Sequence, residues 1–381
     1  MPVLRLQLTA SFAESDGSLV AERRRKGGRR AVEGSLRYPA ASCTAKQASR
    51  LLGGYALPDL PRDISCAAGC FLKHGRKLDK LSPPMSTAIV IPSYNSAPWL
   101  RETLESALLQ TRGAAEVLVV DDGSTDETAA VLAPFEKRVR CLHVENSGVA
   151  RARNLGAAQT QSEWLLFLDS DDRLLPHAAE ALVAAAREAY CAVAYGRTLV
   201  RGRTAAETHL HGHPSAAGAA PHPARANFKR SVITTPGAAV VRRDVFERVG
   251  GFFPGYEPME DRDFWMKCGV LTGFAFCDTV VLDKTFREGS AGSQFGRRIE
   301  SGLRAQLAFL PWCEARGINP AFLGKGPAAI VDQAFREAIW HRCWEIIPAL
   351  RQQAEVLGIH SFWYHRAGLQ ARAARMLTRS G

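Results

Sequence analysis

Acidic side chains gather in three short clusters of this 381-residue chain. The clusters are Asp121-Asp122, Asp169-Ser170-Asp171-Asp172 and Glu260-Asp261. Carboxylates held close together repel one another, and a site that keeps them together usually recruits a divalent cation. A single Asp-Asp-Gly turn after a strand is often only a helix cap, so the spacing of the surrounding elements decides between the two interpretations.

The elements around the first two clusters follow an alternating pattern. Short apolar runs typical of strands buried on both faces of a parallel sheet occupy 88–91, 116–120, 139–144 and 164–168. Segments with helical periodicity occupy 98–110, 149–159 and 176–188, and Ser124 with Glu127 predicts a capping box that opens a further helix. This alternation predicts an α/β fold with a mostly parallel central sheet flanked by helices.

Polar residues follow each of the four predicted strands. In open α/β sheets, ligands bind beyond the carboxyl ends of the strands, so we expect these four loops to converge on one site. The loops are Pro92-Ser93-Tyr94-Asn95, Asp121-Asp122-Gly123-Ser124, Asn146-Ser147-Gly148 with Arg151 and Arg153, and Asp169-Ser170-Asp171-Asp172.

Taken together, the motifs VIPSYN, VVDDGSTD, NSGVARARNLG and FLDSDD resemble those of a family 2 glycosyltransferase with the GT-A fold. Their order and spacing match over about 200 residues, from Thr87 to roughly Phe286. The resemblance implies a nucleotide-sugar donor, by family habit a uridine nucleotide, and a divalent metal. It also implies transfer with inversion at the anomeric carbon, as in the hexosyltransferases that build cell-surface polysaccharides or glycolipids.

By the same resemblance, Asp171 ligates Mn²⁺ or Mg²⁺, and Asp169 lies near the ribose or a metal-bound water. Hard oxygen ligands suit a cation that neutralises the charge of a departing nucleoside diphosphate. Two interpretations of Asp172 remain open: it assists the metal, or it caps the helix that follows.

The resemblance also assigns residues to the nucleotide. Asp122 matches a carboxylate that accepts a hydrogen bond from the base, whereas Asp121 supports the turn. Tyr94 matches an aromatic residue that packs on the base, although ordinary packing at a strand end would also explain it, and Pro92 shapes that loop.

Arg151 and Arg153 open a predicted helix near the expected diphosphate, where guanidinium groups and helix N–H groups favour anions. The alternative is that both are solvated helix charges. Arg287 matches a phosphate contact in a late loop, but Glu288 and Gly289 stand where the family often has a histidine, which puts a further contact of that loop in doubt.

The segment GGFFPGYEPMEDRDFWMKC resembles the acceptor side of the family. Asp261 matches the general base that deprotonates the acceptor hydroxyl, and Glu260 is the second candidate. An acidic pair that opens a helix is by itself more often a cap of the helix dipole. The preceding glycine-rich turn and the aromatic residues that follow favour catalysis.

The charge distribution suggests three regions, 1–84, 85–294 and 295–381, with net charges of +8, −3 and +6. We interpret 1–84 as a basic, disordered leader, and translation from Met85 is a further hypothesis. The middle region is the expected catalytic domain. The last is an expected helical extension, in which Trp340, Trp344, Ile346 and Ile347 form a packing face.

Other function classes fit the sequence less well. A nucleotidyltransferase on a similar fold would need a loop rich in Gly, Arg and Lys after the first strand, where Pro92-Ser93-Tyr94-Asn95 stands. A nucleic-acid-binding protein could use the basic ends, but no aromatic residues interleave the basic run at 23–30. The histidine-rich segment 203–225 favours a flexible insertion over a metal site.

Several features bear on the cellular location. No apolar run approaches the roughly 20 residues of a membrane helix, and no signal-peptide core is evident at the N-terminus. The nine cysteines are scattered, which favours a reducing compartment, and Cys66 with Cys70 lacks a matching pair for zinc. We expect a cytoplasmic protein, with peripheral membrane contact through Arg366, Arg372, Arg375 and Arg379 as an alternative to a solvated face.

Overall fold

The computed structural model describes residues 10–12, 19–21, 86–111, 116–202, 204, 207–233, 235–285 and 294–379. The chain divides into two compact units, Met1–Lys73 and His74–Gly381. In the first unit, β1 (Ala10–Phe12) pairs antiparallel with β2 (Leu19–Ala21). The basic run at 23–30, Cys66 and Cys70 lie outside the described residues, so the leader at 1–84 stays a prediction.

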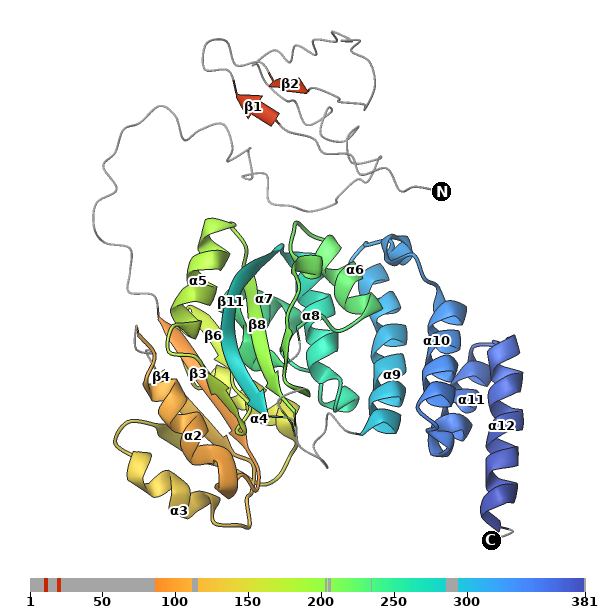
Figure 1. The fold of residues 1–381 in the computed structure, drawn as a ribbon, viewed down its shortest axis with the longest axis horizontal. Coiled ribbons are helices and arrows are strands. Elements are labelled where there is room, and N and C mark those ends of the chain that lie inside the picture. The colour runs from red at the N-terminus through yellow and green to blue at the C-terminus, as the bar shows by residue number, and fades with distance from the viewer. Residues whose placement is uncertain are drawn as a thin grey trace. The chain divides into compact units, whose positions relative to one another are not determined.

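In the second unit, four parallel strands form the first half of a nine-stranded sheet (Figure 1). They lie in the order β5 (Arg140–His143), β4 (Glu116–Asp121), β3 (Thr87–Ser93) and β6 (Trp164–Phe167). Every residue of β3 is buried, because its side chains alternate between two hydrophobic cores on opposite faces of the sheet. The predicted parallel strands are therefore confirmed.

Six helices cover the two faces of this sheet. One face packs on α2 (Ala97–Leu108), α3 (Thr128–Leu132) and α5 (Ala178–Glu188). The other face packs on α4 (Val149–Ala158), α7 (Arg243–Val249) and α8 (Glu260–Leu271). This layered arrangement confirms the predicted α/β class and leaves the carboxyl ends of the parallel strands at one edge.

The second half of the sheet is mixed rather than parallel. Next to β6 follow β10 (Ala239–Arg242), β8 (Val193–Arg201), β11 (Phe274–Thr285) and β7 (Asp172–Leu174), while β9 (His209–His211) pairs with β8. Only β8 and β11 run parallel to each other in this half. The sheet is thus parallel through its first four strands and mostly antiparallel beyond them.

The C-terminal helices stack beyond α8 (Figure 1). They are α9 (Phe295–Glu314), α10 (Pro327–Trp340), α11 (Ile347–Val356) and α12 (Phe362–Arg379). Their shared core also takes residues from α8 and from α6 (His222–Lys229). No helix among the described residues is long and apolar enough to cross a membrane. The boundaries 85–294 and 295–381 stay predictions.

Three local predictions are wrong. Ser124 accepts a hydrogen bond from the Asn95 N–H instead of capping α3, whose Thr128 N–H donates to Asp126. Trp340 is 83% exposed, although Ile346 and Ile347 are buried as expected. The described part of 203–225 is not a loose insertion, because β9 joins the sheet and the segment continues into α6.

Candidate functional site

The predicted loops do converge at the carboxyl ends of the parallel strands. The Asn95 and Ser96 N–H groups donate to Ser124 and Thr128 across 2.9 and 3.0 Å, which joins the loops after β3 and β4. Ser96 Oγ lies 2.7 Å from Ser170 Oγ, which joins the loop after β3 to the acidic loop after β6. Side-chain hydrogen bonds between loops therefore hold the acidic residues over one edge of the sheet.

Asp122 links two of these loops. Its Oδ1 accepts hydrogen bonds from the Ser147 N–H and hydroxyl, and its Oδ2 accepts one from the Gly148 N–H at 2.8 Å. Gly148 adopts a φ of +96°, in the region that favours glycine, at the start of α4. The carboxylate thus orders the turn into α4, and its predicted contact with a base would use the remaining lone pairs. Asp121 accepts the Ser124 N–H, as expected of a residue that supports the turn.

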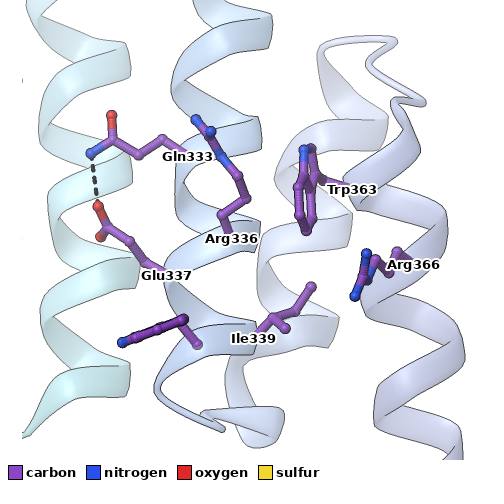
Figure 2. A pocket seen from close by; sticks show the side chains of 7 residues that line it. Gln333, Arg336, Glu337, Ile339, Trp363 and Arg366 are labelled. Atoms are coloured by element: carbon purple, nitrogen blue, oxygen red, sulfur yellow. Dashed lines mark hydrogen bonds between the residues drawn. The ribbon is translucent and has the colours of Figure 1, made fainter.

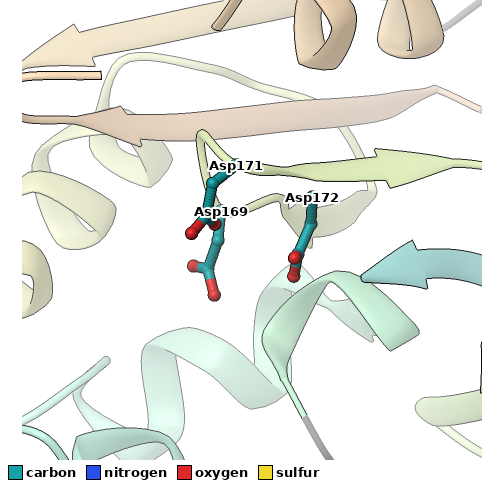
Figure 3. A group of neighbouring side chains, drawn as sticks. All are labelled: Asp169, Asp171 and Asp172. Atoms are coloured by element: carbon teal, nitrogen blue, oxygen red, sulfur yellow. The ribbon is translucent and has the colours of Figure 1, made fainter. Parts of the chain in front are cut away.

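Figure 3 shows the three carboxyl groups of the acidic loop on the same side of that loop. One oxygen from each of Asp169, Asp171 and Asp172 lies within 4.8 Å of the others. A set of carboxylate oxygens at this separation suits a hard divalent cation, so the residues present fit the metal that the sequence predicted. Asp169 and Asp171 are half-buried, whereas Asp172 is fully buried.

Asp172 is held by protein partners. Lys284 of β11 donates to its two oxygens at 3.1 and 3.3 Å, and the Thr235 hydroxyl lies 3.3 Å from Oδ2. Burial raises the pKa of Asp172 to about 6, against the opposing effect of Lys284. Because Asp172 begins β7 and α5 starts only at Ala178, the interpretation of Asp172 as a helix cap is wrong.

Arg153 connects the acidic loop to α8. Its guanidinium donates to Asp169 Oδ1 at 2.7 Å and to Glu260 Oε1 at 2.6 Å, and its side chain is 4% exposed. Burial alone would lower the pKa of Arg153 and raise the pKa of Asp169. The adjacent opposite charges outweigh burial, so the pKa of Arg153 is raised and the pKa of Asp169 is lowered. Arg153 is therefore not a solvated helix charge, and its predicted contact with a diphosphate stays a prediction.

Replacing Arg153 with leucine should lower the free energy of unfolding by about 3 kcal/mol, because it leaves two carboxylates without their buried cation. Arg151→Leu is the matched control: Arg151 lies two residues away, is exposed and, among the described residues, donates to the Ser147 carbonyl alone. Its loss should change stability by less than about 0.5 kcal/mol. Urea denaturation measures both, and equal effects of the two substitutions would contradict a central role for Arg153.

Asp261 lies next to this bridge, in the first turn of α8. The carboxyl group is half-buried, and its Oδ1 accepts the Arg262 N–H at 2.7 Å. Burial, and then the neighbouring Glu260, raise the pKa of Asp261 to about 7. Glu260 is buried and paired with Arg153, so of the two candidate bases Asp261 has the carboxyl group that is poised to exchange a proton near neutral pH.

The remaining predicted residues take different positions. Tyr94 is 51% exposed beside the acidic loop, which is compatible with stacking, and Pro92 is buried in β3. Arg151 is exposed at the start of α4. Arg287 lies outside the described residues. The roles of all these residues toward a nucleotide sugar stay predictions.

Sequence reasoning missed three residues that shape the site. Thr235 donates to Asp169 at 2.9 Å, Lys284 pairs with Asp172, and Glu257 accepts the Ala150 N–H at the start of α4. All three follow the four predicted parallel strands in the chain and come from the second half of the fold. The two apolar runs at 274–277 and 280–282 were the signal that would have placed Lys284 at a strand end.

Comparison with known proteins points to one family. Residues 88–250 match the model of glycosyl transferase family 2. Glycosyltransferase GlyG of Streptococcus pneumoniae serotype 4 is 40% identical over 89 residues, which are 22% of this chain and 30% of that protein. TuaG of Bacillus subtilis strain 168, a glycosyltransferase named for teichuronic acid biosynthesis, is 40% identical over 90 residues, or 23% of this chain and 36% of that protein.

The matched stretches are short relative to these proteins. An uncharacterized glycosyltransferase of Rickettsia felis is 42% identical over 87 residues, and the match covers 22% of this chain and only 14% of that protein. The solved structure of S. aureus TarS residues 1–349 with UDP-GlcNAc aligns with a TM-score of 0.47 at 20% identity. That alignment covers 66% of this chain and 81% of the TarS chain.

The family match spans the four parallel strands, the acidic loop and the helix that bears Arg153. The sequence motifs and this match agree on the same segment. Residues 88–250 of this chain are therefore similar to glycosyl transferase family 2.

Proposed function

We propose that this protein is an inverting glycosyltransferase that moves a sugar from a nucleoside-diphosphate sugar, in the first place a UDP-sugar, to an acceptor hydroxyl. One observation carries the proposal: Arg153 joins Asp169 of the acidic loop to Glu260, the neighbour of Asp261. A site for an anionic leaving group and a carboxyl group with a neutral pKa thereby lie on adjoining elements. The match of residues 88–250 to the glycosyl transferase family 2 model supports the same chemistry.

In this proposal, the donor lies over the loops after β3, β4 and β6. Tyr94 packs on the base and Asp122 accepts a hydrogen bond from it, while Arg151 and Arg287 face the phosphates. Asp171, with Asp169, would hold Mn²⁺ or Mg²⁺, which supplies positive charge to the departing diphosphate. Arg153 and Lys284 balance the remaining negative charge of the acidic loop.

Asp261 performs the proton transfer. The acceptor hydroxyl attacks the anomeric carbon as the bond from that carbon to the diphosphate oxygen breaks. Asp261 takes the hydroxyl proton in the same step, and a single in-line displacement inverts the anomeric configuration. Glu260 stays paired with Arg153 and fixes the start of α8, so Asp261 keeps its position relative to the acidic loop.

The acceptor proposed here is a cell-surface polysaccharide or glycolipid, in keeping with the name of the Bacillus relative. The place of reaction would be the cytoplasm or the inner face of the membrane. The activity is tested by incubating the protein and Mn²⁺ with each of a set of UDP-sugars and measuring the released UDP in a coupled assay. Failure of every UDP-sugar and every other nucleotide sugar to release a nucleotide would overturn it.

The transfer rate should depend on pH through Asp261. A general base must be deprotonated, and the pKa of Asp261 is raised to about 7, so activity should fall as the pH drops through about 7 and level off above 8. A profile of kcat/KM between pH 5 and 9 measures this dependence. A midpoint near 4, the ordinary value of an aspartate, would contradict the assignment.

A further inference from the structure

An open cavity lies in the C-terminal helices, away from the acidic loop. Its volume is about 480 Å³, within the range of small-molecule sites. The lining residues come from α10 and α12: Gln333, Arg336, Glu337, Ile339, Trp340, Trp363 and Arg366. The site proposed for the sugar donor uses none of them.

Two tryptophans give this cavity its apolar surface. Trp340, at the last position of α10, is 83% exposed, and Trp363 of α12 is half-buried against the helical core. A large aromatic side chain left in solvent costs free energy unless a ligand covers it. Exposed indole faces of this kind are the surfaces on which the C–H face of a pyranose ring stacks.

Two cations flank the half-buried Trp363 (Figure 2). The guanidinium carbons of Arg336 and Arg366 lie 5.9 and 5.3 Å from the centre of the Trp363 ring. Neither arginine forms an ion pair with a carboxylate among the described residues. Guanidinium groups that stack on an aromatic ring and keep their N–H donors available are suited to bind carboxylate or phosphate.

The cavity also presents an acceptor. Glu337 accepts a hydrogen bond from Gln333 Nε2 at 2.7 Å, as Figure 2 shows, and both planar side chains lie in the lining. A planar carboxylate beside planar amide and guanidinium groups matches the paired hydroxyls of a sugar. A purely anionic lipid surface offers few donors for Glu337, so the lining favours a hydroxyl-rich ligand that also carries acidic groups.

We propose that this cavity binds an acidic saccharide through stacking on Trp340 and Trp363 and through ion pairs with Arg336 and Arg366. The identification of this saccharide as part of the acceptor polymer rests on the proposed function. The binding of an acidic saccharide in the cavity does not rest on it. The helices pack in the order α8, α9, α10 and α12. The cavity is lined by residues of α10 and α12, so it lies beyond α9 from α8. It would therefore hold a part of a long acceptor distant from the reacting end.

Tryptophan fluorescence titration of the full chain tests the binding without donor or metal. The probes are hexagalacturonate, phosphorylated maltohexaose and neutral maltohexaose. At least one acidic probe should bind more tightly than neutral maltohexaose, and Trp340→Ala and Arg366→Gln should each weaken that binding about tenfold. Because both side chains are exposed, neither substitution should unfold the protein.

Two matched controls accompany these variants. Tyr190→Ala removes an aromatic side chain that is 97% exposed, and Arg248→Gln removes an exposed charge from α7, so both should leave binding unchanged. Asp171→Ala should also bind the acidic probe normally, which separates this site from the proposed donor site. The proposal is overturned if Trp340→Ala binds as the natural chain does, or if only phosphatidylglycerol vesicles bind in a Trp340-dependent manner.

Discussion

Asp261→Asn is expected to lower the transfer rate by roughly 10²–10⁴-fold, the usual contribution of a positioned general base. Asparagine has nearly the same shape, and the Arg262 N–H can still donate to its side-chain oxygen, so α8 should begin as before. What the variant loses is the capacity to accept a proton. Binding of the nucleotide should be retained, because Asp261 is not among the groups proposed to contact it.

Initial rates and nucleotide affinity should be measured side by side on this variant. Asp244→Asn is the matched control, since Asp244 also lies in the first turn of a helix but on α7, where it is exposed and paired with Arg242. Its rate should stay within about twofold of the natural chain. An Asp261→Asn protein that is unfolded, or one with unchanged turnover, would show that Asp261 is not the base.

Asp171→Ala is expected to lower metal-dependent turnover by about a thousandfold. A metal that neutralises a leaving diphosphate contributes several kcal/mol, and each 1.36 kcal/mol corresponds to a tenfold change in rate. Asp169 is held by Arg153 and Thr235, and Asp172 by Lys284, so the cluster should keep its shape when Asp171 is removed. The free energy of unfolding should therefore change little.

Mn²⁺ binding in the presence of UDP, followed by electron paramagnetic resonance, separates loss of the metal from loss of structure. Asp278→Ala removes an exposed carboxylate of β11 that is paired with Arg197, and it should leave Mn²⁺ binding unchanged. Full turnover by Asp171→Ala at the usual Mn²⁺ concentration would contradict the assignment of this residue.

The parallel half of the fold could be predicted because its strands are continuous apolar runs. Ala88–Ile91 is wholly buried between two layers of helices, so burial alone determines its composition. β8 and β11 of the mixed half escaped prediction for the opposite reason. β11 has exposed and half-buried positions among buried ones, and β8 has half-buried and exposed positions at its far end, so neither shows a continuous apolar run.

The site was predicted in part for a related reason. Its carboxylates stand directly after predictable strands, and the order of the strands brings them together. The bridge through Arg153 could not be predicted, because the spacing of Arg153 and Glu260 along the chain, 107 residues, says nothing about their contact. Ser124 shows the same limit, since a tertiary contact with Asn95 replaces the local cap that the sequence favours.

The net charge of +11 also takes a different meaning once the fold is known. In the acidic middle region, cations such as Arg153 and Lys284 are used inside the site, where they hold carboxylates together. Arg336 and Arg366 of the C-terminal helices instead remain available to a ligand. The same residue type thus serves internal charge balance in one part of the chain and recognition in another.

Thermal unfolding with a panel of nucleotide sugars, each with and without Mn²⁺, tests the central claim most directly. A ligand at about 100 times its Kd stabilises the folded state by about 2.7 kcal/mol, which should raise Tm by several degrees in a chain of this size. We expect such a rise for at least one UDP-sugar, only when Mn²⁺ or Mg²⁺ is present, and we expect Asp171→Ala to abolish it. No rise with any nucleotide sugar in either condition would contradict it.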